Sequence, residues 1–331
     1  MAPSICQKTL KNDENKTMRL QKEEVLKGNC TPTSPRTFFY VYSTDIASES
    51  FADLFEEVQT HQKYFVYYAN VRIDLKQPEE IIYHNDIRWW NNSVRSHWPA
   101  PTLGFSDPQT GSDVLKAISD FLDNTVVPVC GSLIHVSLKR YPNEKDIDNL
   151  VARLRETHSV VTVVIPTVSS GGLYAQTMYS LATRTNGLGF FAADTDGYND
   201  AENYINFWDM IPFFTYSANV NVAQSGTLTL PDLSLPYGSW NRMFVTVQDA
   251  GILSSFQNLS LTFSSHIDSY SLTSSNSILQ QDSNFITGSH GFSVANYTVS
   301  LDYHYSDSRQ QTLQIRIYTG QDNDYWIPYA N

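Results

Sequence analysis

The hydrophobic residues of this chain follow two different periodicities, and the change between them constrains the fold more than any other feature of the sequence. From residue 36 to about residue 207, apolar runs typical of strands, such as TFFYVYST and VVTVVIP, alternate with stretches of helical spacing, such as GSDVLKAISDFLDN and EKDIDNLVARLRETH. After Pro212, apolar and polar residues alternate at period two, as in RMFVTVQ and YTVSLDYHY, between clusters of Gly, Asp, Ser and Asn.

These two patterns predict two domains of different fold class. The first half follows the order β-α-β-β-α-β-α-β-α, which is typical of an α/β, doubly wound, mostly parallel sheet with helices on both faces. The second half is typical of an all-β antiparallel sandwich of roughly seven or eight strands. We therefore expect a disordered leader at residues 1–35, the α/β domain at residues 36–210 and the sandwich at residues 211–331.

The overall charge narrows the range of partners. The 331 residues carry a formal net charge of −12 at pH 7, which would repel nucleic acid and anionic membranes. The chain contains no run of about 18 apolar residues, so we expect no membrane span. Proteins or glycans are the expected partners, no motif implies a cofactor, and the oligomeric state is left open.

The N-terminal leader has no apolar core of roughly 7–15 residues and no small-residue cleavage pattern, so we do not expect a secretory signal. Of the three cysteines, Cys6, Cys30 and Cys130, only two can pair at a time, and none has metal-ligand spacing. A Cys30–Cys130 disulfide is one option. A buried Cys130 with two leader thiols is the favoured one.

Asn-x-Ser/Thr sequons occur at Asn15, Asn29, Asn91, Asn258 and Asn296. Such sequons mark acceptor sites for N-linked glycans in secreted proteins. A chain this rich in Ser, Thr and Asn is expected to contain several of them by chance, so the sequons permit secretion without arguing for it. Asn91, Asn258 and Asn296 lie within the two predicted domains and are the candidate glycosylation sites.

Polar residues follow or precede several of the predicted elements. FFYVYSTDIASES places Asp45 directly after the first strand, GSDVLKAI places Ser112 before a helix, and LIHVSLKR places Lys139 after another strand. In an open parallel sheet, the carboxyl ends of the strands meet at one edge, where ligands bind. We therefore expect these three segments to come together.

In their order and spacing, these segments resemble a von Willebrand factor A-like domain over residues 36 to about 207. In that family the first strand ends in D-x-S-x-S, a Thr precedes a helix with an A-[LI] pair five and six residues later, and a later strand ends in T-D-G. Those side chains hold a divalent cation. Ala117 and Ile118 stand five and six residues after Ser112, which is the best single marker of the resemblance.

When the family's cation site is carried over position by position, it is degenerate in this chain. Asp45 keeps the place of the first Asp, but Ala47 and Glu49 replace the two serines. Ser112 can replace the Thr as a hydroxyl ligand, whereas Lys139 stands where the second Asp would be. An ammonium group cannot ligate a cation and would repel one. The resemblance therefore implies no bound metal.

Three interpretations of Asp45 remain open, and the ligand count favours the first two. Asp45 could form an ion pair with Lys139, in which case Lys139→Asp should create measurable magnesium affinity. It could instead cap the helix that begins near Ser50, since Ser, Thr and Asp are favoured caps. The third interpretation is a working cation site that uses Asp45, Ser112 and Glu49.

The run IIYHNDIRWWNNSVRSHWP carries two adjacent tryptophans, Trp89 and Trp90. Two successive residues of a strand point to opposite faces, so one of the two rings could be exposed. Tryptophan is a common anchor in interfaces, which makes these residues candidates for binding. Alternatively, the second ring packs under a flanking loop or against the sandwich.

The sequence nominates no catalytic set. No two of the eight histidines lie within four residues of each other, so the local zinc signatures are absent. GSHG at residues 288–291 places a Ser beside a His, but the G-x-S-x-G context is missing and a hairpin turn is expected. SSGG at residues 169–172 lacks the Lys-Ser/Thr of a phosphate-binding loop, so a loop leading into a helix is expected.

The KRYPN segment at residues 139–143 and the SGGL segment at residues 170–173 resemble those of a nematode-expanded family of mostly secreted proteins with an A-like domain. Many members are thought to act at the gut or cuticle, in contact with microbes. The resemblance implies an extracellular protein with a part in defence. The lack of a visible signal peptide keeps a cytoplasmic location as the alternative.

These observations together predict a non-enzymatic recognition or adhesion protein that works without a metal ion. A cation-dependent adhesion module that uses Asp45 and Ser112 is the first alternative. A hydrolase with an unrecognised site is the second, although no motif nominates its substrate.

Overall fold

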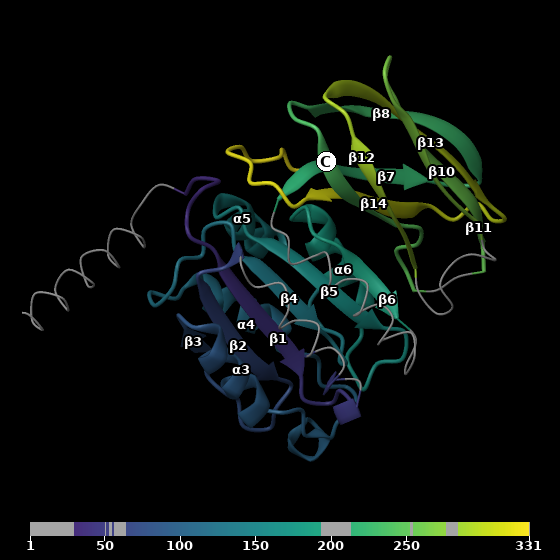
Figure 1. Cartoon of the computed structure of the whole chain (residues 1–331). Coiled ribbons are helices and arrows are strands. Elements are labelled where there is room, and N and C mark those ends of the chain that lie inside the picture. The colour runs from purple at the N-terminus through teal and green to yellow at the C-terminus, as the bar shows by residue number, and fades with distance from the viewer. Residues whose placement is uncertain are drawn as a thin grey trace, which may run out of the picture.

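The computed structural model describes residues 30–49, 51–52, 55, 64–192, 213–251, 254–275 and 284–330. Within them, the first half of the chain forms a mostly parallel sheet with helices (the α/β domain), and the second half forms an antiparallel sandwich (the β-sandwich; Figure 1). The predicted fold class is therefore confirmed. The predicted domain boundary near residues 208–212 lies outside the described residues.

The α/β domain is built on a six-stranded sheet of order β3-β2-β1-β4-β5-β6. All neighbouring pairs are parallel except β2 and β3, which are antiparallel. The carboxyl ends of the parallel strands therefore meet at one edge. The strands are β1 (Thr37–Ser43), β2 (Tyr67–Ile73), β3 (Ile82–His84), β4 (Leu133–Ser137), β5 (Val160–Pro166) and β6 (Gly189–Ala192).

The central strands are buried on both faces, which explains why they read as continuous apolar runs. In β1, Phe39 and Val41 pack in one core, and Phe38 and Tyr40 pack in another. None of the helices in the described part of the chain is long and apolar enough to span a membrane. The helices are α3 (Ile87–Ser96), the short 3-10 helix η2 (Pro101–Leu103), α4 (Val114–Leu122), α5 (Asp148–Glu156) and α6 (Ala175–Arg184).

The β-sandwich consists of two antiparallel sheets of four strands each, ordered β11-β10-β13-β8 and β12-β9-β14-β7. Apolar side chains of both sheets alternate inward and form a third core, as the period-two pattern predicted. The strands are β7 (Phe214–Val222), β8 (Ser225–Leu235), β9 (Ser239–Thr246), β10 (Phe256–Ser264), β11 (Ser269–Ser275), β12 (Phe285–Phe292), β13 (Ala295–Tyr305) and β14 (Gln311–Thr319).

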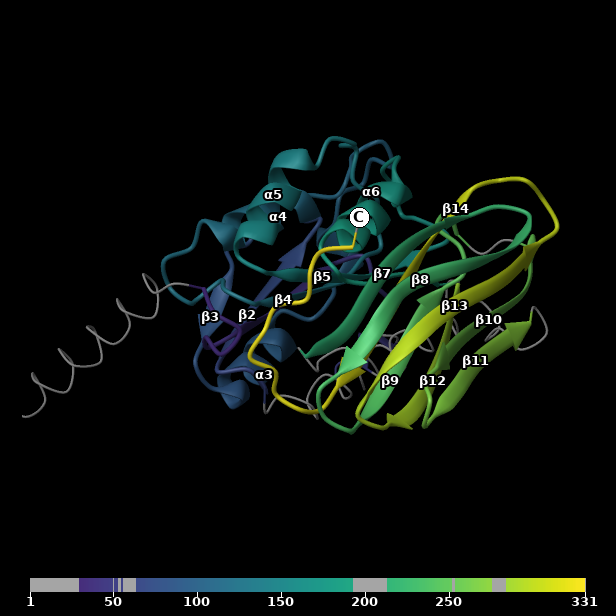
Figure 2. The same ribbon diagram turned by 90° about the horizontal axis from the view of Figure 1, so that it is seen from above.

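The β-sandwich lies beside the α/β domain (Figures 1 and 2). It packs against β6, the edge strand of the parallel sheet. The N–H groups of Gly189 and Phe191 donate to the side-chain oxygens of Gln314 and Asn284, both at 2.8 Å, and both hydrogen bonds are buried. A buried N–H group without an acceptor costs about 1–3 kcal/mol. The sandwich therefore completes the hydrogen bonding of the sheet edge.

A second set of buried polar contacts joins the two domains at α6. The hydroxyl of Tyr179 donates to the carbonyl oxygen of Thr312 at 2.7 Å. Arg316 of β14 is fully buried and donates to the carbonyl oxygens of Asn186 and Gly187, just beyond the end of α6, at 2.9 and 3.0 Å. A positive charge at the carboxyl end of a helix is favoured by the helix dipole. The junction is therefore polar as well as apolar.

The structure differs from the predicted disordered leader at residues 30–35. Cys30 and Cys130 form a disulfide, so the favoured interpretation with free thiols is wrong and the other option is the one that forms. The bridge attaches residues 30–35 to the α/β domain close to the start of β4, so these residues are not a disordered leader. Residues 1–29 lie outside the described residues.

The disulfide makes a direct chemical prediction. When the protein is expressed in an oxidising compartment and alkylated in denaturant without reductant, one of its three cysteines should react, and all three should react after reduction. Cys30→Ser should lower the free energy of unfolding by about 4 kcal/mol, because the bridge closes a loop of 100 residues. Cys6→Ser is the control and should leave stability unchanged. Three adducts without reductant would contradict the bridge.

Candidate functional site

The carboxyl edge of the parallel sheet is organised around a buried arginine. Arg140 lies shortly after β4, and its side chain is 2% exposed. It donates through Nη2 to Asp45 Oδ2 at 3.2 Å. The same guanidinium donates at 2.8–3.0 Å to three backbone carbonyl oxygens, those of Phe105, Asp107 and Thr110. The segments after β1, after η2 and after β4 are therefore tied to one positive charge.

The loop after β5 completes this cluster. Ser170 donates through Oγ to Asp45 Oδ2 at 2.7 Å. A side chain at Gly171 would place its Cβ 2.1 Å from Arg140 Nη1, and Gly172 has a φ of +78°, which favours glycine. The SSGG segment is thus a loop that leads into α6, as expected. Gly171 lets the backbone lie directly on the guanidinium, and Gly172 lies against the backbone of Tyr141.

The two segments that carried the family resemblance are in contact at this edge. The N–H of Ser170 donates to the carbonyl oxygen of Lys139 at 2.9 Å, and the N–H of Tyr141 donates to that of Gly171 at 2.8 Å. KRYPN and SGGL, about thirty residues apart in the chain, therefore form one unit around Arg140.

A second network at the same edge centres on Asp74, which the sequence interpretation did not nominate. Asp74 follows β2 and is fully buried. Ser43 and Ser112 donate through Oγ to its two carboxylate oxygens at 2.5 and 2.6 Å. Burial raises the pKa of Asp74 to about 7, although the two serine hydrogen bonds act in the opposite direction. The sequence signal was the Asp that ends YYANVRID, since β2 lies beside β1 and ends at the same edge.

The residues predicted to share a degenerate cation site are thus divided between two networks. Asp45 binds Arg140, whereas Ser112 binds Asp74. Glu49 is exposed and takes no part in either network.

The predicted partner of Asp45 is corrected by one residue. The structure pairs Asp45 with Arg140, while Lys139 donates through Nζ to the carbonyl oxygen of Val168 at 3.0 Å. Successive residues at the end of a strand point in different directions, so Lys139 and Arg140 cannot both face Asp45. The sequence indicated that a cationic side chain pairs with Asp45, but it could not determine which one.

The charges at this edge bear directly on metal binding. Within the described residues, no group of three or more His, Cys, Asp or Glu side chains is placed to hold a metal ion. Arg140 already neutralises Asp45. A metal ion about 4 Å from the guanidinium would be opposed by roughly 4 kcal/mol per unit of charge at an effective dielectric constant of about 20. The edge is therefore suited to stay ordered without a cation.

Exposed apolar side chains flank the buried pair. Val168 is 60% exposed, and its carbonyl oxygen accepts the bond from Lys139. Leu173 is 54% exposed and stands two residues after Gly171, which lies on Arg140. Leu103, 47% exposed, stands two residues before Phe105, whose carbonyl oxygen also accepts from the guanidinium. The edge thus presents apolar contacts around a fixed ion pair.

The two adjacent tryptophans lie in helix α3, not in a strand as the sequence interpretation assumed. Successive residues of a helix point about 100° apart. Trp90 is completely buried and donates through Nε1 to the carbonyl oxygen of Ala69 at 3.2 Å, whereas Trp89 is 65% exposed. Of the two candidates, only Trp89 presents a surface that a partner could contact.

The candidate glycosylation sites differ in their accessibility. Asn91 lies within α3, and its Oδ1 is buried without a hydrogen-bond partner among the described residues. Asn258 on β10 and Asn296 on β13 are exposed. Asn15 and Asn29 lie outside the described residues. The two sandwich sequons are therefore the accessible ones of the three that were nominated.

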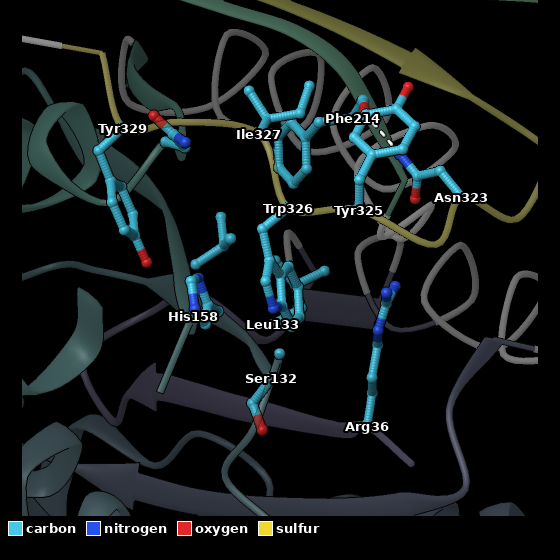
Figure 3. Close-up of a pocket in the computed structure, with 13 residues that line it drawn as sticks. Arg36, Ser132, Leu133, His158, Phe214, Asn323, Tyr325, Trp326, Ile327 and Tyr329 are labelled. Carbon is cyan, nitrogen blue, oxygen red and sulfur yellow. Dashed lines mark hydrogen bonds between the residues drawn. The ribbon is translucent and has the colours of Figure 1, made fainter. Parts of the chain in front are cut away.

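A pocket at the opposite end of the strands is filled by the C-terminal tail (Figure 3). The ring of His158 stacks on that of Trp326 at 4.3 Å and lies 6.1 Å from that of Tyr329. The guanidinium of Arg36 lies 5.8 Å from the Trp326 ring. The cavity that remains is about 40 Å³, enough for one or two water molecules. This pocket holds the tail in place and is too small for a ligand.

The Ser-His pair of GSHG lies in β12, because the segment pairs with β9 along its whole length, and the expected hairpin turn is wrong. Successive residues of a strand point to opposite faces. Ser289 accepts a hydrogen bond from Arg242 Nη1 at 2.9 Å, while His290 lies 3.1 Å from Asp268 and stacks on Tyr270. A nucleophile and its base must be within hydrogen-bonding distance. Ser289 and His290 therefore do not form a catalytic dyad.

Comparison by sequence finds one match in the C-terminal half. Residues 218–320, which make up most of the β-sandwich, match a family model described as a domain of unknown function (DUF7154). None of the curated proteins compared with the chain matches it.

Comparison by structure finds proteins that are similar to each half. A von Willebrand factor type A protein from Catenulispora acidiphila is 7% identical, with 87% of this chain and 65% of that one covered and a TM-score of 0.35. Proximal thread matrix protein 1 from the mussel byssus is 10% identical, with 59% and 51% covered and a TM-score of 0.38.

The β-sandwich has its own structural neighbours. A carbohydrate binding module from Cellvibrio mixtus lichenase 5A, in complex with cellotriose, is 14% identical, with 30% of this chain and 78% of that one covered and a TM-score of 0.20. All three TM-scores lie below 0.5.

The buried carboxyl of Asp74 should make stability depend on pH. Its pKa of about 7 lies above 3.8, the ordinary value of an aspartate carboxyl, so between these two pH values the folded state holds a proton that the unfolded state has lost. The free energy of unfolding should fall as pH rises through this window. Between pH 5 and pH 8, the free energy of unfolding measured by urea denaturation should fall by about 2–3 kcal/mol more in the unmodified protein than in Asp74→Asn.

The control for this measurement is Asp324→Asn, at an exposed position. This variant should keep the pH profile of the unmodified protein. Parallel profiles for the unmodified protein and Asp74→Asn would contradict the raised pKa.

Removing the central arginine should be costly. Arg140→Met leaves Asp45 and three carbonyl oxygens without their donor, and breaking a buried pair costs about 3–5 kcal/mol. Lys116→Met removes an exposed pair with Asp120, worth about 0–1 kcal/mol, and is the control. If Arg140→Met and Lys116→Met lowered the free energy of unfolding equally in urea, the cluster around Arg140 would not organise the edge.

Proposed function

We propose that this chain is a non-enzymatic recognition or adhesion protein that binds its ligand without a metal ion. One observation carries the proposal: the guanidinium of Arg140 binds Asp45 and three backbone carbonyl oxygens at the edge where an A-like domain would hold a cation. The positive charge is part of the chain, so the edge needs no cation to order its loops. The edge is also where ligands bind in open parallel sheets.

The ligand that this edge suits best is another protein. Leu103, Val168 and Leu173 are exposed apolar side chains next to a rigid polar cluster, and exposed apolar patches with a polar surround are typical of protein interaction sites. Asp45 is mostly buried and already paired, so the contacts on offer are chiefly apolar.

A glycan is the second candidate ligand, and one feature of the β-sandwich favours it. Trp240 is 63% exposed on β9. Its ring lies close to Gly291 of β12, where an added Cβ would be 3.2 Å from Trp240 Cε3. An exposed indole supported from beneath by the backbone offers a flat apolar surface on which a sugar ring can stack.

An extracellular location supports the same proposal. Disulfides persist in oxidising compartments and are rare in the cytosol, and this chain closes a loop of 100 residues with one. The resemblance of the KRYPN and SGGL segments to a mostly secreted nematode family points the same way. A role in defence at an epithelial surface is part of this proposal.

The test is capture of partners from an extracellular extract by the immobilised chain, in millimolar magnesium or in EDTA. Retention should be the same in both and should fall with Val168→Asp, because a charge at one of the exposed apolar positions of this edge opposes apolar contact. Val294→Asp, at a similarly exposed valine of the sandwich, is the matched control and should retain its partners. Periodate treatment of the extract, which destroys glycans, should leave retention intact.

Three outcomes would contradict the proposal in different ways. Loss of retention in EDTA would favour the cation-dependent module. Loss after periodate together with loss in Trp240→Ala would move the site to the sandwich and make the ligand a glycan. Full retention by Val168→Asp would exclude the carboxyl edge as the contact surface.

A further inference from the structure

A groove with largely apolar walls lies on the β-sandwich, away from the carboxyl edge. It is a groove of about 670 Å³, within the range of about 300–1,000 Å³ that is usual for ligand sites. Residues 215–221 of β7 form one continuous side. The other sides come from residues 230–232, 234 and 236, at and just beyond the end of β8, and from residues 325 and 327–330 of the tail.

The orientation of the backbone in β14 determines what β7 presents to this groove. The N–H of Gln314 donates to Thr246 Oγ1 at 2.8 Å, and the N–H of Thr312 donates to Asp249 Oδ2 at 2.7 Å. Thr246 belongs to β9, on the far side of β14 from β7. The N–H groups of Gln314 and Thr312 therefore point away from β7.

The partners of these two residues on β7 must then point their own backbone groups outward. Asn219 lies opposite Gln314, and Asn221 lies opposite Thr312. In an antiparallel pair, residues that do not exchange hydrogen bonds with each other direct N–H and C=O to the outer sides of the two strands. Asn219 and Asn221 thus present unpaired ladder positions to the groove.

The outer sides of β7 and β6 differ in whether their backbone groups have partners. β7 ends its sheet, and in the described part of the chain no strand pairs with its outer side. Proteins usually protect such edges with charged residues, proline or bulges. FTYSANVNV contains neither charge nor proline, and the register irregularity of the β7–β14 pair lies between Phe214 and Tyr216, before the two asparagines. At β6, by contrast, Gln314 and Asn284 occupy the outward N–H groups.

The walls of the groove indicate the kind of occupant. They carry the aromatic and apolar side chains of Tyr216, Leu230, Ile327 and Tyr329. Among the lining residues that the structure describes, Asp232 supplies the one formal charge. An unpaired strand edge offers main-chain hydrogen bonds, and the pockets beside it accept alternate side chains.

We infer that this groove binds an extended peptide segment, which adds to β7 as a further strand and carries apolar side chains and at least one basic one. The basic side chain faces Asp232. The site is separate from the carboxyl edge of the α/β domain and does not depend on the function proposed for it.

The test uses a displayed library of linear octapeptides, selected on the full chain, and measures the affinity of the enriched peptides by fluorescence anisotropy. Asn221→Pro removes the outward N–H, and Asn221→Ala keeps it. Both lose the same exposed contact with Thr312 Oγ1. Proline is tolerated at an edge where the N–H faces outward. Asn221→Pro should weaken binding by at least about tenfold and Asn221→Ala by less than about twofold.

Two further measurements do not rely on the proline variant. Asp232→Lys, at an exposed position, should weaken the same peptides by at least about fivefold, and Val168→Asp at the carboxyl edge should not change their affinity. Amide exchange at Asn219 and Asn221 should slow when peptide binds. Failure to enrich any peptide, equal affinity for the Pro and Ala variants, or unchanged exchange at these two amides would each overturn the inference.

Discussion

The arrangement of the molecule depends on the edge strand β6 and on its buried N–H groups. Gly189 and Phe191 need acceptors once they leave water, and Gln314 and Asn284 of the sandwich supply them. This requirement places β14 against the parallel sheet. The tail that follows β14 then crosses the junction and packs at His158. β14 lies between β9 and β7, and β7 is the last strand of its sheet. The outer edge of β6 is thus covered by side chains of the sandwich, whereas no strand of the described residues pairs with the outer edge of β7.

A single guanidinium has the corresponding role at the carboxyl edge. Arg140 draws loops from several strands onto one charge, much as a bound cation would, but it cannot dissociate. Under the function proposed above, this surface keeps its geometry at any metal concentration. The burial of Asp74 beside it, with two serine donors, adds a group whose protonation changes near neutral pH. The two networks together replace the shared site that Asp45 and Ser112 were predicted to form.

Much of the fold could be predicted because its strands and helices are long and regular. VVTVVIP is buried on both faces, and GSDVLKAISDFLDN has one apolar face, so each pattern has one favourable solution. Helix α3 was missed, since its mean character is polar and its buried face consists of Trp90, Ser93 and Val94. GSHG was predicted as a turn from its glycines, although pairing with β9 keeps it extended. Local composition was misleading wherever a neighbouring strand decided the conformation.

The candidate site shows the same contrast between what the local sequence predicts and what contacts with distant segments decide. The sequence by itself determined that the basic residues Lys139 and Arg140 follow the strand LIHVS, because residue identity decides charge whatever the fold. It also determined the two fold classes, because periodicity decides which face is buried. Only the tertiary structure decided that Arg140 and not Lys139 turns inward, that Asp74 joins the edge, and that Cys30 reaches Cys130. Side-chain direction, burial and the pairing of distant backbone groups arise from packing between segments far apart in the chain, and no local pattern encodes them.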